Sequence, residues 1–166
     1  MENPAVQDYY PPEFSYCYGC GRLNQDGLHV QSRWMDAGSG KSISRFTPRP
    51  YHTALPGFIY GGLLASLIDC HGTGTAALAA YHAEGRPFDS LPANRFVTAS
   101  LHVDFLRPTP LTDLELIGQV TEVKMKENRT KKVVVAIMVY ANSQPCVNGQ
   151  VVAVQVPQDF GRTRNS

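Results

Sequence analysis

The sequence has no long hydrophobic run and almost no net charge. Its longest uninterrupted apolar stretch, Val133–Val139, spans seven residues, whereas a helix needs roughly twenty to cross a bilayer. Fifteen Lys and Arg residues against fourteen Asp and Glu residues give a formal charge of +1. No global electric field therefore draws the chain to nucleic acid or to a membrane, and we expect neither as a partner.

No secretion signal is visible in the sequence, because no basic segment followed by an apolar core is found among its first residues. We therefore expect a cytoplasmic protein whose four cysteines are reduced thiols. Cys17 and Cys20 form a C-x-x-C pair, which can supply half of a tetrahedral zinc site or a redox pair. The second half is missing, since Cys70 and Cys146 stand alone in the sequence. A structural turn is the favoured interpretation, zinc and redox roles remain as alternatives, and we expect no bound metal.

The length and composition predict one domain. A chain of 166 residues with 43% hydrophobic content can build a single sizeable core. Residues 1–15 are rich in Pro and Tyr without periodicity and are predicted to form an extended N-terminal arm. The domain is predicted to span residues 16–157, and residues 158–166 to form a polar C-terminal tail.

Hydrophobic periodicity predicts one long helix from about Gly61 to Tyr81, apolar nearly all round and therefore buried. Gly72 and Gly74 inside it each cost about 1 kcal/mol relative to Ala, so we expect close packing there against a sheet or a twin helix. Alternating patterns predict strands at Leu28–Trp34, Lys41–Phe46, Arg95–Leu106, Leu114–Lys126, Val133–Tyr140 and Cys146–Val156. This order predicts an α+β domain in which an antiparallel sheet wraps around one long central helix.

The start of the helix, Gly61-Gly62, is a candidate oxyanion hole. Helix N-termini leave backbone N–H groups unpaired and carry partial positive charge, and glycines leave room for a negative oxygen. Asp69 lies eight residues after Gly61, about two turns and ~12 Å along the axis. An antiparallel second copy of the helix could bring the two groups together. Taken alone, a glycine pair before a helix is usually a turn, and the carboxylate is as readily structural as catalytic.

The chain resembles the hotdog-fold acyl-CoA thioesterases of the phenylacetate-pathway type over roughly residues 14–156. The resemblance rests on the order of three motifs: Cys17-Tyr18-Gly19-Cys20-Gly21 with Gly27-Leu28, then Gly57-Phe58-Ile59-Tyr60-Gly61-Gly62 with Asp69, then Val103-Asp104-Phe105-Leu106-Arg107-Pro108. It implies a hotdog fold and a homodimer, or a dimer of dimers, whose sheets pair and whose active sites lie at the ends of the interface.

The resemblance also implies roles for individual residues. The backbone N–H of Gly61 or Gly62 would polarise the thioester carbonyl, and Asp69 of the other subunit would activate water or attack directly. Thr73 and Thr98 fall where related enzymes place water-positioning hydroxyls. As an alternative, both threonines are packing and capping residues.

The sequence departs from the family at the glycine motif, where Tyr60 stands in place of the usual His. Ala54 fills a position where some members carry Asn or Gln, whereas His52 matches the family's His-x-x-x-Pro-Gly group. We expect His52 and Tyr60 to contact the substrate and Arg107 to bind coenzyme A phosphates. The other cations available for that purpose are Lys124, Lys126, Arg129, Lys131 and Lys132, although such a run is more often a solvated turn.

Three functions fit these residues. The first is hydrolysis of an acyl-CoA or another acyl thioester, with coenzyme A as part of the substrate and no separate cofactor. The second is a dehydratase or lyase on the same scaffold, which needs an Asp/His pair that only His52 or His71 could complete. The third is a non-catalytic module that binds an acyl or aromatic ligand, for which Tyr60 is the best argument. A Ser or Cys nucleophile with His and Asp partners is not recognisable.

Overall fold

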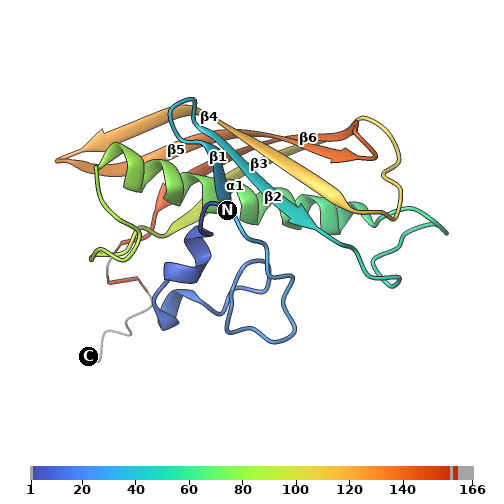
Figure 1. The fold of residues 1–166 in the computed structure, drawn as a ribbon, viewed down its shortest axis with the longest axis horizontal. Coiled ribbons are helices and arrows are strands. Elements are labelled where there is room, and N and C mark those ends of the chain that lie inside the picture. Colours follow the sequence, from blue (N-terminus) through green and yellow to red (C-terminus); the bar gives the residue numbers. More distant parts are fainter. Residues whose placement is uncertain (1, 158, 161–166) are drawn as a thin grey trace.

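A six-stranded antiparallel sheet covers one long helix in the computed structural model, which describes residues 2–157 and 159–160 (Figure 1). Most of the predicted polar tail, residues 158–166, lies outside the described residues. The sheet order is β1-β2-β4-β5-β6-β3. The elements are β1 (Arg33–Asp36), β2 (Lys41–Phe46), α1 (Gly61–Ala83), β3 (Phe96–Phe105), β4 (Leu114–Lys126), β5 (Arg129–Ala141) and β6 (Gln144–Gln155). The predicted arrangement of a sheet around one helix is confirmed.

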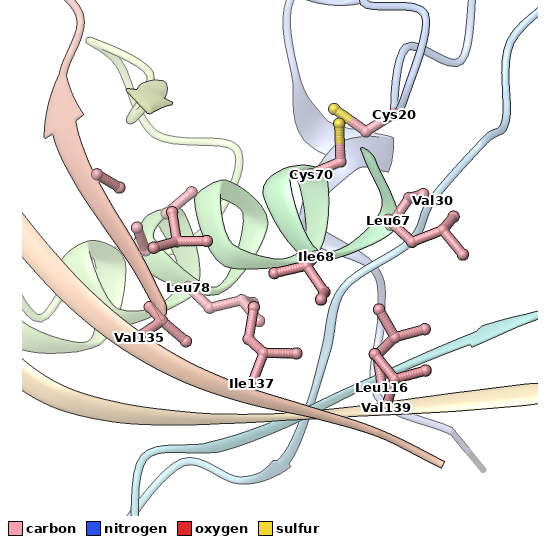
Figure 2. Close-up of a cluster of buried hydrophobic side chains, with 14 of the residues drawn as sticks. Cys20, Val30, Leu67, Ile68, Cys70, Leu78, Leu116, Val135, Ile137 and Val139 are labelled. Carbon is pink, nitrogen blue, oxygen red and sulfur yellow. The ribbon is translucent and has the colours of Figure 1, made fainter. Parts of the chain in front are cut away.

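The core lies between α1 and the concave face of the sheet. Figure 2 shows side chains of the helix facing those of the central strands: Leu67, Ile68 and Leu78 from α1, Leu116 from β4, and Val135, Ile137 and Val139 from β5. The inward residues of β5 alternate, as expected for a strand with one buried face. Gly72 packs against Val151 of β6, where any side chain would overlap the valine. The close packing predicted for this glycine is confirmed.

Two-residue turns join the last three strands. Glu127 and Asn128 have φ values of 52° and 61°, and Asn142 and Ser143 have 49° and 61°. Two successive positive φ values give a turn whose twist matches that of a hairpin, so pairing continues up to the turn on both sides. For this reason β5 begins at Arg129, four residues before the predicted Val133.

The first strand is shorter than predicted and shifted. The alternation over Leu28–Trp34 is real, but only Arg33–Asp36 joins the sheet as β1. The Leu28 N–H donates to the Tyr18 carbonyl at 2.8 Å and the Val30 N–H to the Gly19 carbonyl at 2.9 Å. The first half of the predicted strand therefore pairs with the cysteine loop rather than with the sheet.

Residues 2–15 do not form the predicted extended arm. They contain two 3₁₀ helices, η1 (Val6–Tyr9) and η2 (Pro12–Phe14), beneath α1 on the side away from the sheet (Figure 1). Val6 and Tyr10 are buried. Burial of these side chains against the helix favours a compact path, a tertiary effect that the local sequence does not reveal.

A buried polar network ties this N-terminal segment to the helix. The His71 ring is fully buried, with Nδ1 3.0 Å from Ser32 Oγ and Nε2 3.2 Å from Ser42 Oγ. The Gln7 amide donates to Ser32 Oγ at 3.2 Å, and Ser42 Oγ lies 2.7 Å from Thr75 Oγ1. His71 is thus a core residue with both ring nitrogens paired, and burial lowers its pKa to about 3.

Acidification is expected to destabilise the fold through His71. In the unfolded state His71 takes up a proton near its ordinary pKa of about 6.5, whereas in the folded state its pKa is about 3. Between these two pH values, His71 therefore gains a proton when the protein unfolds. This group should therefore lower the free energy of unfolding by about 2 kcal/mol between pH 7 and pH 5. Denaturant unfolding of wild type and His71→Asn at both pH values measures this change in the free energy of unfolding, and the variant should lose this part of the pH dependence.

The matched control is His82→Asn, because His82 is exposed on the same helix, and it should keep the wild-type pH dependence. An unchanged pH dependence in His71→Asn would contradict the assignment.

Candidate active site

Helix α1 begins with two backbone donors that have no acceptor among the described residues. Tyr60 is the N-cap residue and its side chain makes no capping hydrogen bond. The N–H groups of Leu63 and Leu64 donate to the Tyr60 carbonyl at 3.1 and 3.4 Å, which leaves those of Gly61 and Gly62 unpaired within the part of the chain described. Partial positive charge collects at such a helix start.

The segment before the helix is held by backbone hydrogen bonds. The Tyr60 N–H donates to the His52 carbonyl at 3.0 Å and the Ile59 N–H to the Thr109 carbonyl at 2.8 Å. Two separate loops thus fix where the helix starts. The position of the Gly61 and Gly62 donors is therefore set by the surrounding structure and not by the glycines themselves.

An open hollow of 390 Å³ lies beside Gly61. Its wall is mostly apolar and carries one cation, and it consists of Ile59, Gly61, Leu64, Phe105, Leu106, Arg107, Pro108 and Thr109. Arg107 Nη1 donates to Gln144 Oε1 at 3.1 Å on the exposed surface. The hollow has the character of an acyl-binding site, with apolar walls and few polar groups.

Asp69 lies on the part of α1 that faces β3, where it is half-buried. Thr98 of β3 donates a hydrogen bond from Oγ1 to Asp69 Oδ1. Thr73, by contrast, directs its hydroxyl to the helix backbone, 3.3 Å from the Asp69 carbonyl and 3.2 Å from the Cys70 carbonyl. The structure therefore brings together Asp69 and Thr98, whereas the Thr73 hydroxyl is bonded to main-chain oxygens.

His52 lies in the loop before the helix, and Tyr60 is the N-cap residue of the helix. His52 Nδ1 accepts a hydrogen bond from the Arg49 N–H at 2.9 Å, and burial, followed by the Arg49 charge, lowers its pKa. It lines a second open hollow, of 680 Å³, together with Arg45, Arg49 and the loop around Gly27. The exposed Tyr60 ring lies against Gly62, where any added side chain would overlap it. His52 and Gly61 thus face different hollows of the described chain.

The lysine-rich hairpin lies far from Gly61. Arg129 contacts Glu84 at 3.5 Å, and the Thr130 N–H donates to Glu84 at 2.8 Å, just beyond the C-terminal end of α1. The helix has 23 residues, so its two ends are about 33 Å apart. Of the cations considered for phosphate binding, Arg107 is the one that lines the Gly61 hollow.

Cys70 does not stand alone, which the sequence did not reveal. Its Sγ lies 3.9 Å from Cys17 Sγ, and with Cys20 the three sulfur atoms lie within 4.8 Å of one another. Hydrogen bonds from the Cys20 and Cys70 side chains, with backbone N–H groups of Cys20 and Gly19, hold the pKa of Cys17 far below its ordinary value. The C-x-x-C loop therefore meets the helix immediately after Asp69.

Comparison with protein families decides the identity of this fold. The family model of the thioesterase superfamily matches residues 56–147, a range that includes the glycine pair, Asp69 and Thr98. The chain belongs to the thioesterase superfamily. Membership supports a thioester hydrolase at the level of the family. None of the curated proteins matches the chain.

Solved structures of similar proteins agree with this family assignment. A thioesterase superfamily protein from Shewanella loihica is 42% identical, with 89% of this chain and 100% of that chain covered and a TM-score of 0.63. The PaaI protein of the Escherichia coli phenylacetic acid degradation operon is 17% identical, covering 78% and 81%, with a TM-score of 0.58. A Haemophilus influenzae thioesterase is 11% identical, covering 82% and 85%, with a TM-score of 0.61. The last two likenesses show the fold alone, and the predicted hotdog fold is confirmed.

Among the residues described, no helix combines the length and the apolar character that a membrane span requires.

Proposed function

We propose that the protein hydrolyses acyl-CoA thioesters at a site shared by two copies of the chain. The observation that carries the proposal is the pair of unpaired N–H groups at Gly61 and Gly62, which open onto an apolar hollow. Asp69, on the same helix, lies about two turns further on, too far for both to act on one thioester within a single chain. A second chain can supply the missing carboxylate.

The exposed edge of the sheet, at β3, favours such a dimer. Strand β3 is at the edge of the sheet and pairs only with β6, so one row of its backbone groups is unpaired within the described chain. Its side chains Leu101 and Phe105 are 40% and 55% exposed. An antiparallel second β3 would continue the sheet and cover these apolar side chains, which is the pairing that we propose.

The adjacent face of α1 is suited to a partner helix. Four half-exposed residues lie on this face: Gly62, Ala65, Ser66 and Asp69. The first is three and four positions before the middle two, which are four and three positions before the last. Small side chains on one face let a second helix approach closely. In an antiparallel pair, Asp69 of one copy then lies near the Gly61 donors of the other.

The chemistry follows from these groups. The thioester oxygen accepts hydrogen bonds from the Gly61 and Gly62 N–H groups, which stabilise the negative charge of the tetrahedral intermediate and contribute on the order of 10²–10³ in rate. Asp69, bonded to Thr98, removes a proton from a water that attacks the carbonyl carbon, for typically 10²–10⁴. The carbon–sulfur bond then breaks, the acid is released, and the thiolate takes up a proton.

The histidines argue against a dehydratase or lyase. His71 is fully buried with both ring nitrogens paired to serines, so it cannot reach a substrate. His52 faces the other hollow and accepts a hydrogen bond at Nδ1. Neither supports an Asp/His pair at Gly61, whereas hydrolysis needs only Asp69, Thr98 and the two glycine donors.

Release of thiol from acyl thioesters tests the proposal. Aliphatic and aromatic acyl-CoAs and the matching N-acetylcysteamine thioesters, which carry no phosphate, are incubated with the protein and a thiol reagent. Enzyme-dependent release from at least one acyl-CoA is expected, and release from none would refute the hydrolase.

Arg107→Ala should raise KM for acyl-CoA about tenfold, since a charge-assisted hydrogen bond contributes at least about 1.5 kcal/mol, and leave KM for the phosphate-free thioester unchanged.

The matched control for Arg107 is Lys124→Ala, a cation on the distant hairpin, which should leave both KM values unchanged. If Arg107→Ala raises KM equally for the two substrates, the Arg107 side chain maintains the shape of the hollow through Gln144 and does not bind the coenzyme A phosphates.

A further inference from the structure

We propose that Cys17, Cys20 and Cys70, the thiol cluster, bind one Zn²⁺ ion. The three cysteines come from two distant parts of the chain, the loop before β1 and the middle of α1, and their sulfur atoms converge beside the helix. Figure 2 shows Cys20 and Cys70 with their sulfur atoms side by side. The expectation of no metal rested on the missing second half of a zinc site, and Cys70 supplies a third ligand that the linear sequence hid.

The spacing of the sulfur atoms fits a tetrahedral metal. Zn–S bonds of about 2.3 Å at tetrahedral angles place two sulfur ligands about 3.8 Å apart. Cys17 Sγ and Cys70 Sγ are 3.9 Å apart, and all three sulfur atoms lie within 4.8 Å of one another. The sulfur atoms of a disulfide would be about 2.05 Å apart. The cluster is thus already close to the arrangement that zinc needs, whereas a Cys17–Cys70 disulfide requires a further approach of the loop and the helix.

Charge favours a metal thiolate over neutral thiols. Arg95 lies over the Tyr10 ring, 5.0 Å from its centroid, with Nη2 3.9 Å from Cys20 Sγ. It forms no ion pair with a carboxylate among the described residues, and its other hydrogen bond goes to the Phe96 carbonyl at 2.8 Å. Three thiolates with Zn²⁺ carry a net charge of −1, which Arg95 neutralises. Three neutral thiols, or a disulfide with one thiol, leave this half-buried cation uncompensated, and Cu⁺ with three thiolates leaves an excess negative charge.

The loop is shaped to bring its cysteines onto the helix. A side chain at Gly19 would overlap the Cys70 sulfur, and one at Gly21 would overlap backbone atoms of Ser15 and Cys17. The Gly21 N–H closes the turn by donating to the Cys17 carbonyl at 2.7 Å. Because a larger residue at position 19 would block this approach, the C-Y-G-C sequence allows the loop cysteines to lie against Cys70 of α1.

A solvent molecule would complete the coordination. Among the described residues, the group of potential ligands comprises these three cysteines, and Cys17 is partly exposed, so water can reach the site. Three protein ligands and one water form a known coordination set for zinc. The metal would fix the loop to α1 at the residue after Asp69, independently of whether the protein hydrolyses acyl-CoA.

The experiment measures zinc in the purified full-length protein. The protein is reduced, incubated with excess ZnCl₂, desalted and analysed by plasma mass spectrometry, and about one zinc per chain is expected. A mercurial reagent should release this zinc, and Co²⁺ in its place should give the intense visible bands of tetrahedral cobalt thiolate. Cys17→Ser and Cys70→Ser should each lower zinc to a tenth of wild type or less, because the loss of even a residue that only supports a ligand typically costs about 10–100-fold in metal affinity.

Cys146→Ser is the matched control, because Cys146 is buried but lies outside the cluster, and it should retain full zinc. Circular dichroism shows whether each variant is folded. Less than about a tenth of an equivalent in wild type would overturn the proposal whatever the variants do. Full zinc retention in both Cys17→Ser and Cys70→Ser would also overturn it, as would a metal-free wild type with a Cys17–Cys70 disulfide by peptide mass mapping.

Discussion

Asp69→Asn is expected to lower kcat for acyl-CoA hydrolysis at least about a hundredfold, the scale of losing a general base. The amide has the same shape as the carboxylate, and its oxygen can still accept the hydrogen bond from Thr98 Oγ1. It cannot take a proton from water at neutral pH. The fold should therefore remain intact while the reaction step that needs a base is lost.

Steady-state release of thiol measures this effect, with circular dichroism and size-exclusion chromatography as checks on fold and assembly. Asp89→Asn is the matched control, since Asp89 is exposed in the loop after α1, and it should keep wild-type kcat. A folded Asp69→Asn protein with wild-type turnover would assign Asp69 a structural role. KM should change little, because the lost interaction belongs to the transition state rather than to substrate binding.

Local signals predicted the elements that carry the site. The glycine pair marked the start of α1 at Gly61, where the structure also begins the helix. Asn128 and Asn142 are of a residue type that favours turns, and both two-residue turns that contain them adopt positive φ values. Each of these features is decided within a few residues, by helix periodicity or by the backbone freedom of turn residues, and the sequence is sufficient for such decisions.

Contacts between distant segments could not be predicted in the same way. Cys70 has no neighbour in the sequence that indicates a partnership with Cys17, since the helix that carries it and the loop that covers it meet only in the folded chain. The path of residues 2–15 likewise depends on the polar network around His71. A polar residue on an apolar helix signals that a partner must exist, but it does not say which segment provides it.

Two inactive variants are expected to restore activity to each other if the site is shared. Gly61→Pro removes one candidate oxyanion donor, and Asp69→Ala removes the base. Each homodimer should lose at least about a hundredfold in rate. In a heterodimer, one site carries both lesions, while the other combines Gly61 of one chain with Asp69 of its partner and is intact. Such heterodimers should recover up to about half of the wild-type activity per dimer.

The structure favours Gly61→Pro as the donor variant. Proline is accepted at the first helical position, and it restricts the preceding residue to extended backbone, which Tyr60 already adopts with φ −61° and ψ 128°. A Cβ atom at Gly61 would lie 3.4 Å from the Phe105 ring, in ordinary contact. At Gly62 it would overlap the Tyr60 ring, so Gly62→Pro must displace an exposed side chain and serves as the companion variant.

The heterodimers are made by co-expression with two different tags and purified through both. Mixtures of the homodimers that have not exchanged chains provide the baseline, which should remain at the level of the single variants. If each chain builds its own site, every site in the heterodimer carries one lesion and no recovery occurs. Absence of recovery with both proline variants, in dimers shown to be folded, would exclude the shared site. Recovery with only one of them would instead identify which of the two N–H groups polarises the thioester.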